Sequence, residues 1–253
     1  MTAYDGLAPV YDWLVPDALL EPDGAVAAFD HVVADLPAGA RVLDCACGTG
    51  QLAVGLANRG FDVVASDASA GMVARTRRLA DAHGATVRAI VCPWEDLRAV
   101  AGGPFDAVLC VGNSLTHAEG PAGRRTALAA MADVLVPGGL LAVTSRNWER
   151  LREQRPGLDV ADQLTYRAGR AGLAIRVWSL PDAWEAPHHL EVAVAELDGQ
   201  QVVAVVGERL TFWPFTHAQL TDELRAADLE PTSSSYAPAA ERYGILARRT
   251  SSR

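Results

Sequence analysis

The first candidate for chemistry is a glycine-rich turn that follows a short apolar run. Val42 and Leu43 lead into Asp44, and Gly48 and Gly50 come soon after it. Glycine has no Cβ, so these two positions allow unusual backbone torsions and the close approach of a ligand. The segment that follows has helical apolar spacing, which predicts a helix N-terminus at this turn. The pattern indicates a binding site for a nucleotide-type ligand.

A second acidic residue narrows the class of ligand. Asp67 ends the next apolar run, and the spacing Gly48-x-Gly50-x-x-Ala53 satisfies a fingerprint in which such a residue binds a ribose diol. That fingerprint also allows NAD, so an NAD-dependent oxidoreductase stays open as an alternative. Asp44 favours a different ligand, because its carboxylate would repel a pyrophosphate held at the same helix N-terminus. S-adenosylmethionine carries a sulfonium and an ammonium beside its ribose and adenine, so it can use both carboxylates.

The composition excludes several classes of function. The chain has 253 residues and a formal net charge of -9, which disfavours nucleic acid as a partner. All 22 cationic residues are arginine, which excludes a pyridoxal Schiff base and a phosphate-loop lysine. The four cysteines lack the spacing of a zinc site or of a secreted framework, so we expect no metal. No apolar run is long enough to span a membrane and the N-terminus lacks signal-peptide features, so we expect a cytoplasmic protein without membrane contact.

Short β-rich runs alternate with longer helical patterns in the first part of the chain, which predicts an α/β fold with a parallel sheet and crossover helices. Strands are expected at residues 41–45, 62–66, 86–91, 105–111 and 140–145, and helices at residues 22–36, 51–59, 70–83 and 123–136. The sequence Pro137-Gly138-Gly139 is expected to end the last of these helices.

The pattern changes after Arg146. Long alternating runs at residues 172–180, 188–197 and 201–213 predict an antiparallel β insert, placed where it could cover a substrate. Helical spacing resumes at residues 216–228, with Thr216 as the expected N-cap. Two final strands, at residues 232–236 and 243–249, are expected to form a terminal antiparallel hairpin in the sheet.

The length fits one domain with an elaboration better than two full domains. We therefore expect a single domain over residues 1–253 that has four parts. They are an N-terminal helical cap (1–36), a ligand-binding core (37–148), the antiparallel insert that covers the substrate site (149–215), and a last helix with two strands (216–253).

Residues at three strand ends could complete a site. Trp94 follows the third strand, where its indole could pack on an adenine or could simply cover the core. A loop from Gly112 to His117 follows the fourth strand and brings small and amide side chains to the centre of the site. Arg146 ends the fifth strand, and an arginine that leaves an apolar run needs either a ligand carboxylate or an internal acidic partner.

The order of these motifs resembles the class I S-adenosylmethionine-dependent methyltransferases, and within them the glycine N-methyltransferase group with its glycine/sarcosine methyltransferases. Residues 43–50 match the group's Leu-Asp-Val-Ala-Cys-Gly-Thr-Gly turn, and Asp67 matches its ribose-binding aspartate. More specific matches are residues 112–117 to Gly-Asn-Ser-x-x-His and residues 146–148 to Arg-Asn-aromatic. The resemblance covers most of the chain and is closest over residues 41–148.

The resemblance implies a Rossmann-like, seven-stranded, mostly parallel sheet and S-adenosylmethionine as cofactor, with S-adenosylhomocysteine as product. It implies that Asn113 and Arg146 hold the carboxylate of the methyl acceptor, that Tyr166 and Trp213 form pocket walls, and that His117 is at most a proton acceptor or orienting group. The candidate donor contacts are Tyr4, Trp13, Asp44, Ala46, Gly48, Gly50, Asp67, Ala68, Pro93, Trp94, Glu95 and Val111.

The chain also departs from the group's pattern. The group has an arginine on its N-terminal helix that meets the methionine carboxylate of the donor. This chain has no arginine before Arg41, so that carboxylate must be recognised differently. Pro93 replaces an asparagine, and Phe212 and Trp213 replace tyrosines, which removes hydroxyls that could bond a small substrate. The resemblance implies N-methylation of glycine or a related small carboxylated amine, whereas the lost hydroxyls favour an acceptor that is bulkier or less polar than glycine. A natural-product N- or O-methyltransferase and a non-catalytic S-adenosylmethionine sensor stay open, as does a homo-oligomeric state.

Overall fold

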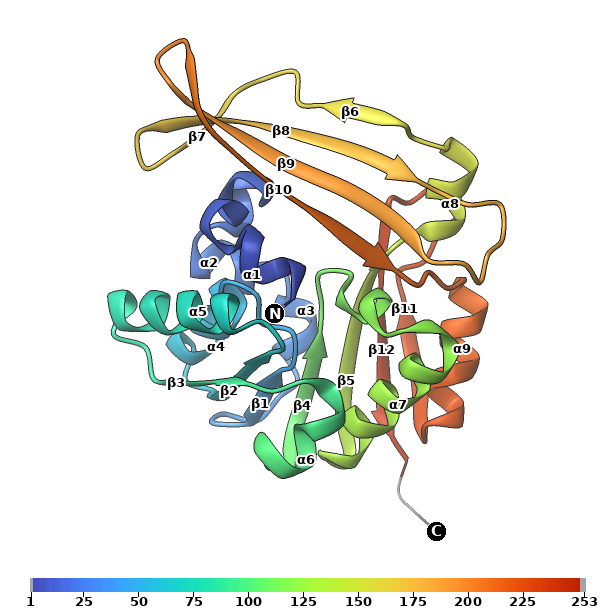
Figure 1. The fold of residues 1–253 in the computed structure, drawn as a ribbon. Coiled ribbons are helices and arrows are strands. Elements are labelled where there is room, and N and C mark those ends of the chain that lie inside the picture. Colours follow the sequence, from blue (N-terminus) through green and yellow to red (C-terminus); the bar gives the residue numbers. More distant parts are fainter. Residues whose placement is uncertain (1, 251–253) are drawn as a thin grey trace.

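The computed structural model describes residues 2–250, which form two β-sheets with helices around them (Figure 1). The strands of the larger sheet are β1 (Arg41–Asp44), β2 (Asp62–Asp67), β3 (Val87–Val91), β4 (Phe105–Cys110), β5 (Leu135–Arg146), β11 (Leu229–Ser234) and β12 (Arg242–Arg249). Their order is β11-β12-β5-β4-β1-β2-β3. β12 runs antiparallel to both of its neighbours, whereas the pairs from β5 to β3 are parallel. The predicted seven-stranded, mostly parallel sheet with a terminal antiparallel hairpin is confirmed.

Helices cover both faces of this sheet because its buried strands alternate their apolar side chains between two cores. Val42 and Val63 face one core, and Leu43 and Val64 face the other. The larger flanking helices are α4 (Gln51–Asn58), α5 (Ala70–His83), α6 (Leu97–Val100), α7 (Gly120–Asp133) and α9 (His217–Ala226). Helices α4 and α5 pack on the first core, and α6, α7 and α9 pack on the second. Among the helices described, none is both long and apolar enough to span a bilayer.

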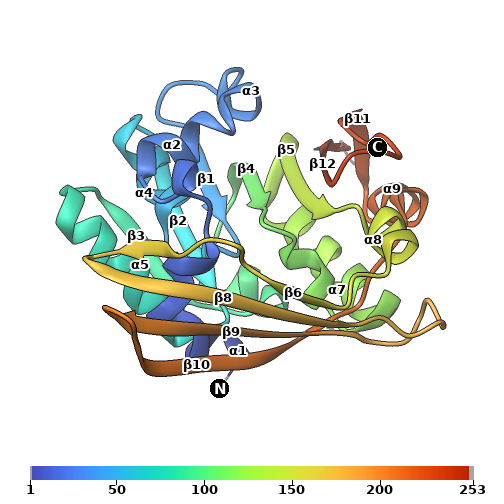
Figure 2. The same cartoon turned by 90° about the horizontal axis from the view of Figure 1, so that it is seen from above.

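The smaller sheet lies across the carboxyl ends of the parallel strands, as both views show (Figures 1 and 2). Its strands are β6 (Leu158–Val160), β7 (Thr165–Arg167), β8 (Arg170–Ser179), β9 (His188–Asp198) and β10 (Gln201–Phe212). The order is β10-β9-β8-β6, with β7 also paired to β8, and every pair is antiparallel. The predicted antiparallel insert after the fifth strand is therefore confirmed, and β6 and β7 extend it beyond the runs that the sequence predicted.

The N-terminal segment differs from its prediction. Helix α1 (Ala3–Leu7) and 3-10 turns at Ala8–Leu14 and Asp17–Leu19 precede two short helices, α2 (Pro22–Ala27) and α3 (Asp30–Val33). The single helix predicted over residues 22–36 was wrong. Phe29 leaves the helical region (φ -114°, ψ 14°) where its ring packs against the core, so tertiary packing overrides the helical spacing.

The region around the fourth predicted helix also needs correction. Helix α7 begins at Gly120 rather than at residue 123, because Pro121 fits the first turn, where its missing N–H costs nothing. Pro137, Gly138 and Gly139 do not end this helix, which stops at Asp133. They lie in an irregular stretch of β5, because Phe105 of β4 pairs with Leu135 whereas Ala107 pairs with Leu140. The β5 residues between these two partners are not paired with β4, so a proline is tolerated there. Helix α8 (Trp148–Gln154), capped by the Asn147 side chain, was not predicted.

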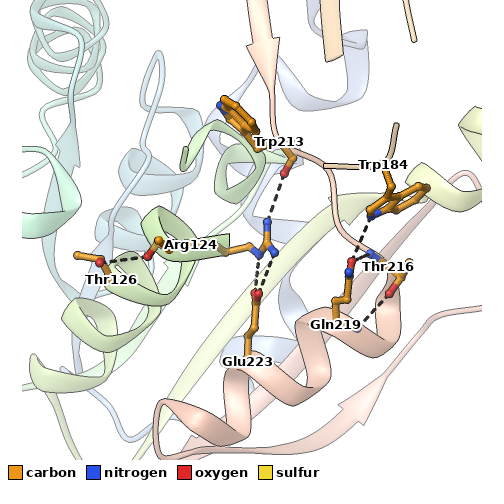
Figure 3. A network of polar contacts seen from close by, with 8 residues as sticks. Arg124, Thr126, Trp184, Trp213, Thr216, Gln219 and Glu223 are labelled. Carbon is orange, nitrogen blue, oxygen red and sulfur yellow. Dashed lines mark hydrogen bonds and ion pairs between the residues drawn. The ribbon is translucent and has the colours of Figure 1, made fainter. Parts of the chain in front are cut away.

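Helix α9 begins at the N-cap that the sequence predicted. The Thr216 hydroxyl accepts the Gln219 N–H at 3.0 Å, and the Gln219 side chain accepts the Thr216 N–H at 2.9 Å (Figure 3). Thr216→Ala is expected to lower the free energy of unfolding by about 1 kcal/mol, because one N–H of the first turn loses its acceptor. Urea denaturation measures this change. Thr221→Ala, on the same helix, is the matched control and should be close to neutral; equal losses in both would contradict the capping argument.

Candidate active site

A cavity of about 1320 Å³ lies between the two sheets, at the carboxyl ends of the parallel strands. Open α/β sheets bind their ligands at this edge. Predicted site residues that line the cavity are Tyr4, Asp44, Ala46, Gly48, Asp67, Ala68, Pro93, Trp94, Glu95, Val111 and His117. Neighbouring strands are about 4.8 Å apart, so β12 lies roughly 14 Å from β1 across the sheet. The cavity therefore has two ends, a β1–β2 end and a β5–β12 end.

The glycine turn joins β1 to α4 at the β1–β2 end. Gly48 (φ 53°) and Gly50 (φ 93°) both have left-handed torsions, and Gly50 is the N-cap of α4. A Cβ on Gly50 would lie 2.7–2.9 Å from atoms of Thr76, including its Cα. Gly50 does not line the cavity, so its role is to let the turn pass beside α5. Gly48 does line it, and a Cβ there would meet no protein atom within 4 Å.

Asp44 is a buried carboxylate that the described residues leave partly unsatisfied. Its side chain is 1% exposed, and Oδ1 has no hydrogen-bond partner among residues 2–250. Burial raises the pKa of Asp44 to about 7, although the Ala46 N–H bonds to the carboxylate and opposes that rise. An uncompensated buried charge is costly unless a partner arrives. A cationic ligand would supply that partner.

Asp67 is held in a fixed orientation at the end of β2. Its Oδ2 accepts the Gly48 N–H at 3.0 Å and its Oδ1 accepts the Ser69 N–H at 2.8 Å. Burial raises the pKa of Asp67, and these two backbone hydrogen bonds oppose the effect. Because Asp67 lines the cavity with its rotamer fixed, it is prepared to accept two hydroxyl donors from a ribose.

Trp94 lies where β3 ends and is also fixed by a hydrogen bond. Its indole N–H donates to the Cys45 carbonyl at 2.8 Å, and the ring packs against the second core. Pro93 and Glu95 line the cavity beside it. The indole face is therefore a rigid apolar surface for an aromatic base.

The N-terminal helix is attached to the first turn of α5 through Asp5. The Asp5 carboxylate accepts the Ser69 hydroxyl at 2.6 Å and the Gly71 N–H at 2.9 Å. These hydrogen bonds, from Ser69 first, lower the pKa of Asp5 to about 2. An anion at a helix N-terminus is favourable, so this contact holds the cavity-lining Tyr4 and Tyr11 over the β1–β2 end.

Tyr4 and His117 form a chain of hydrogen bonds across the cavity wall. His117 Nδ1 lies 2.9 Å from the Thr211 carbonyl, which can only accept, so Nδ1 carries the proton. His117 Nε2 is then an acceptor, and the Tyr4 hydroxyl donates to it at 2.8 Å. Burial lowers the pKa of His117 and raises that of Tyr4, so the imidazole is neutral at pH 7.

Asn113 is engaged in the protein itself. Its Oδ1 accepts the Arg146 N–H at 3.0 Å and the Trp148 indole N–H at 3.1 Å, and its Nδ2 donates to Thr116. The side chain is 8% exposed and does not line the cavity. Asn113 therefore positions the backbone of Arg146 in this structure.

Arg146 projects from the end of β5 and packs over the Trp178 ring, with Cζ 5.4 Å from the ring centroid. Burial first, and then the charge of Arg242, lower its pKa to about 10. No ion pair joins its guanidinium to a carboxylate among residues 2–250. It lies just beyond the cavity lining, on the same face of β5 as the lining residue Thr144.

Three predicted aromatic residues lie away from the cavity lining. Trp13 packs against Gly172 of the insert, and Tyr166 is 66% exposed on β7. Trp213 donates its N–H to the Thr116 carbonyl at 2.6 Å, and its carbonyl faces the buried Arg124 (Figure 3). These three side chains therefore do not line the cavity, although the Trp213 backbone is hydrogen-bonded to the Gly112–His117 loop.

Several lining residues were missed at the sequence level: Tyr11, Thr144, Ser235, Arg242 and Tyr243. Tyr11 could have been found, because it lies two helical turns after Tyr4. The others depend on how β12 pairs with β5, and no local pattern reports that pairing.

Comparison with known proteins identifies the family. A profile described as a methyltransferase domain matches residues 42–139. Glycine N-methyltransferase of Oryctolagus cuniculus is 30% identical over 203 residues, which cover 74% of this chain and 68% of that protein. The chain belongs to the class I S-adenosylmethionine-dependent methyltransferases. S-adenosylmethionine is therefore the cofactor of this methyltransferase, and the predicted cofactor is confirmed.

Other relatives match a smaller part of the methyltransferase. Glycine/sarcosine N-methyltransferase of Parasynechococcus marenigrum is 44% identical over 116 residues, 46% of this chain but only 41% of that protein. The chain thus spans about two fifths of the first curated relatives that it matches. Among solved structures, the CcbJ methyltransferase from Streptomyces caelestis superposes with a TM-score of 0.79 over 99% of both chains at 22% identity, which shows a shared fold.

The residues at the β1–β2 end fit this donor. Asp44 offers an unsatisfied carboxylate oxygen to a cation, Asp67 offers a fixed carboxylate to a ribose, and Trp94 offers an apolar face to an adenine. The family's N-terminal arginine has no counterpart in α1 or α2, because the first arginine of the chain is Arg41. Among residues 2–250, the arginines that line the cavity are Arg209 and Arg242, and Arg209 is already paired with Glu191.

Proposed function

We propose that this methyltransferase transfers a methyl group to the nitrogen of a small amine that carries a carboxylate, glycine or a related compound. The observation that carries the proposal is Arg146, a partly buried guanidinium without an ion-pair partner among residues 2–250, just beyond the lining at the β5–β12 end of the cavity. A carboxylate matches the planar fork of a guanidinium, and a buried cation favours such a partner.

Methyl transfer from a sulfonium to an amine depends more on the alignment of the two reactants than on general acid–base catalysis. When bound, the sulfonium donor supplies an activated methyl group for in-line displacement. The chain then has to hold a neutral amine on the axis of that methyl group and exclude water. The insert and α1 cover the cavity between the two sheets, and anchoring the acceptor carboxylate near Arg146 would orient its amine toward the β1–β2 end.

The Tyr4–His117 pair can take up the proton that an ammonium acceptor must lose. Tyr4 oxygen would accept a proton from the ammonium while its own hydroxyl proton passes to His117 Nε2, which gives a neutral tyrosine and an imidazolium. The Thr211 carbonyl supports this, because it accepts the Nδ1–H in both charge states of the ring. Methyl transfer from a sulfonium does not require a strong base, so we assign the Tyr4–His117 pair an assisting role.

The test is turnover of methyl-labelled S-adenosylmethionine with a panel of amines, followed by mass detection of the product. Methylated glycine or a related amino acid supports the proposal. Binding of S-adenosylhomocysteine without turnover of any amine would favour the non-catalytic sensor. The NAD-dependent oxidoreductase is set aside, because the relatives of this chain are methyltransferases.

Arg146→Ala is expected to raise the KM for the acceptor at least tenfold, because a charge-assisted pair contributes roughly 1.5–3 kcal/mol. The dissociation constant of S-adenosylhomocysteine, measured by calorimetry, should change less than about twofold, since Arg146 lies at the other end of the cavity. Arg98→Ala, on α6, is the matched control. Equal weakening of acceptor and donor binding would show that Arg146 has a structural role.

A larger natural-product acceptor is the second candidate. The cavity is large for a donor and glycine alone, and residues 14–29 give it an apolar wall that includes Leu14, Leu19 and Phe29. CalS10 from Micromonospora echinaspora, described as an amino pentose methyltransferase, shares the fold with a TM-score of 0.74 at 23% identity. Product from amino sugars, but not from amino acids, in the same panel would favour this candidate.

A further inference from the structure

The register of the terminal hairpin places two arginines opposite one another. Arg242 of β12 pairs directly with Arg146 of β5 in the antiparallel ladder. Side chains at directly opposed positions point to the same face, with Cβ atoms about 5 Å apart. Like charges in this arrangement destabilise a sheet, so the folded protein retains an unfavourable pair here.

The charged groups around this pair do not neutralise it. Arg176, which also faces Arg146, has Asp159 as its partner at 3.6 Å, and Glu241 is bound by Arg150 at 2.9 Å. Neither Arg146 nor Arg242 forms an ion pair among residues 2–250. Over Arg146, Arg242 and the two neighbouring ion pairs alone, the formal charges sum to two positive units. A bound group with two negative charges would balance them.

The pair lies at the β5–β12 end of the cavity, and the charge of Arg242 also acts on Tyr11, which lies over the β1–β2 end. Arg242 lines the cavity together with Thr144 and Ser235, at the β5–β12 end. The donor-binding carboxylates Asp44 and Asp67 end β1 and β2, three and four strands away from β12. The Trp178 ring packs against the Arg146 guanidinium and restricts it before any ligand binds, whereas Arg242 is exposed.

We propose that Arg242 and Arg146 together bind a dianionic group of the methyl acceptor, either a phosphate monoester or a pair of carboxylates. This proposal rests on the proposed function of the cavity and narrows its substrate class. Arg242 is a specificity-determining residue: with Arg146 alone, a monocarboxylate such as glycine would suffice. Two guanidinium groups on one face can each donate hydrogen bonds to separate anionic oxygens.

The first experiment tests the anion site without catalysis. Calorimetry of the protein saturated with S-adenosylhomocysteine is carried out with inorganic phosphate and, separately, with malonate, which distinguishes the two sources of dianion. At least one should bind saturably to the natural protein. Arg242→Gln should weaken that binding about tenfold, the factor expected for a charge-assisted hydrogen bond. Arg248→Gln, on the same strand but outside the cavity, is the matched control and should change it less than about twofold.

A second readout guards against a variant that simply misfolds. Because Arg242→Gln removes one of two opposed like charges, the ligand-free variant should unfold at the same temperature as the natural protein or higher. Its affinity for S-adenosylhomocysteine should be unchanged. The proposal is overturned if neither dianion binds the natural protein, if Arg248→Gln weakens binding equally, or if Arg242→Gln weakens the donor product instead.

The second experiment links the site to turnover. Labelled donor is offered with O-phosphoethanolamine and aspartate as dianionic amines, and with ethanolamine and glycine as their matched controls. A dianionic amine should exceed its control at least tenfold in kcat/KM, and Arg242→Gln should remove most of that preference. Glycine as the best acceptor would overturn the proposal. If no amine is methylated but phosphate or malonate binds as expected in calorimetry, the proposed function is contradicted while the anion site is supported.

Discussion

Asp44→Asn is expected to weaken binding of S-adenosylmethionine roughly 100-fold, because removing one member of a buried, hydrogen-bonded charge pair costs about 2–5 kcal/mol. The same change should stabilise the ligand-free protein at pH 8, since it removes a buried carboxylate whose Oδ1 has no partner among the described residues. Weaker donor binding together with higher stability of the ligand-free protein would show that the Asp44 carboxylate serves ligand binding and not folding. Calorimetry and thermal denaturation measure the two effects.

The dependence on pH follows from the raised pKa of Asp44, about 7. Below pH 7 the carboxylate becomes protonated and can no longer attract a cation, so donor affinity should fall as the pH falls from 8 to 6. Stability has the opposite slope. The folded-state pKa lies above the unfolded value of 3.8, so the folded protein binds more protons between these values and loses stability as the pH rises through them. Asp44→Asn should flatten both curves.

Asp62→Asn is the matched control for Asp44, because Asp62 is exposed and paired with Arg41 at the other end of the sheet. It should leave donor affinity and its pH dependence unchanged. An Asp44→Asn protein that binds the donor as tightly as the natural protein would contradict the electrostatic role of this residue.

Gly50→Ala is expected to lower the free energy of unfolding by about 3 kcal/mol. Part of the loss, about 1–2 kcal/mol, is the cost of a left-handed residue with a Cβ, and overpacking against buried Thr76 adds roughly 1–3 kcal/mol. Donor binding should weaken as well, because Thr76 donates to the Gly48 carbonyl at 3.0 Å and so supports the turn. Urea denaturation and calorimetry measure the two losses.

Gly60→Ala separates the two contributions at Gly50. Gly60 is also left-handed (φ 87°), but a Cβ there would meet no protein atom within 4 Å. It should therefore lose only the conformational part, about 1–2 kcal/mol, and keep its donor affinity. Equal losses at the two positions would show that the contact with Thr76 does not matter.

The sequence predicted the first five strands and the helices α4 and α5 well, because each is a local pattern. Alternating or continuous apolar runs marked the strands, and Ser69 and Gly84 bound α5 at positions that such residues favour. It failed where packing decides between local options. Phe29 interrupts a helical pattern to reach the core, and residues 136–139 look like a helix end although they lie within β5.

The candidate site divides in the same way. Asp44, Gly48 and Asp67 lie within one strand–turn–helix–strand unit, so their spacing along the chain already indicates their juxtaposition. Asn113 shows the limit of that reasoning, because its motif marked it as an acceptor contact while its amide bonds to Arg146 and Trp148. Whether it also meets the acceptor stays a prediction.

The amino-acid sequence by itself determined the class of enzyme and the proposed donor end of the cavity, because parallel strands joined by crossover helices carry their candidate ligand groups at successive strand ends. Only the tertiary structure could indicate the proposed acceptor end. The opposition of Arg146 and Arg242, 96 positions apart in the numbering, follows from the register of an antiparallel pair, and register is set by long-range packing of whole strands. The cover supplied by α1 and the insert likewise depends on contacts between distant segments, such as Tyr4 with His117.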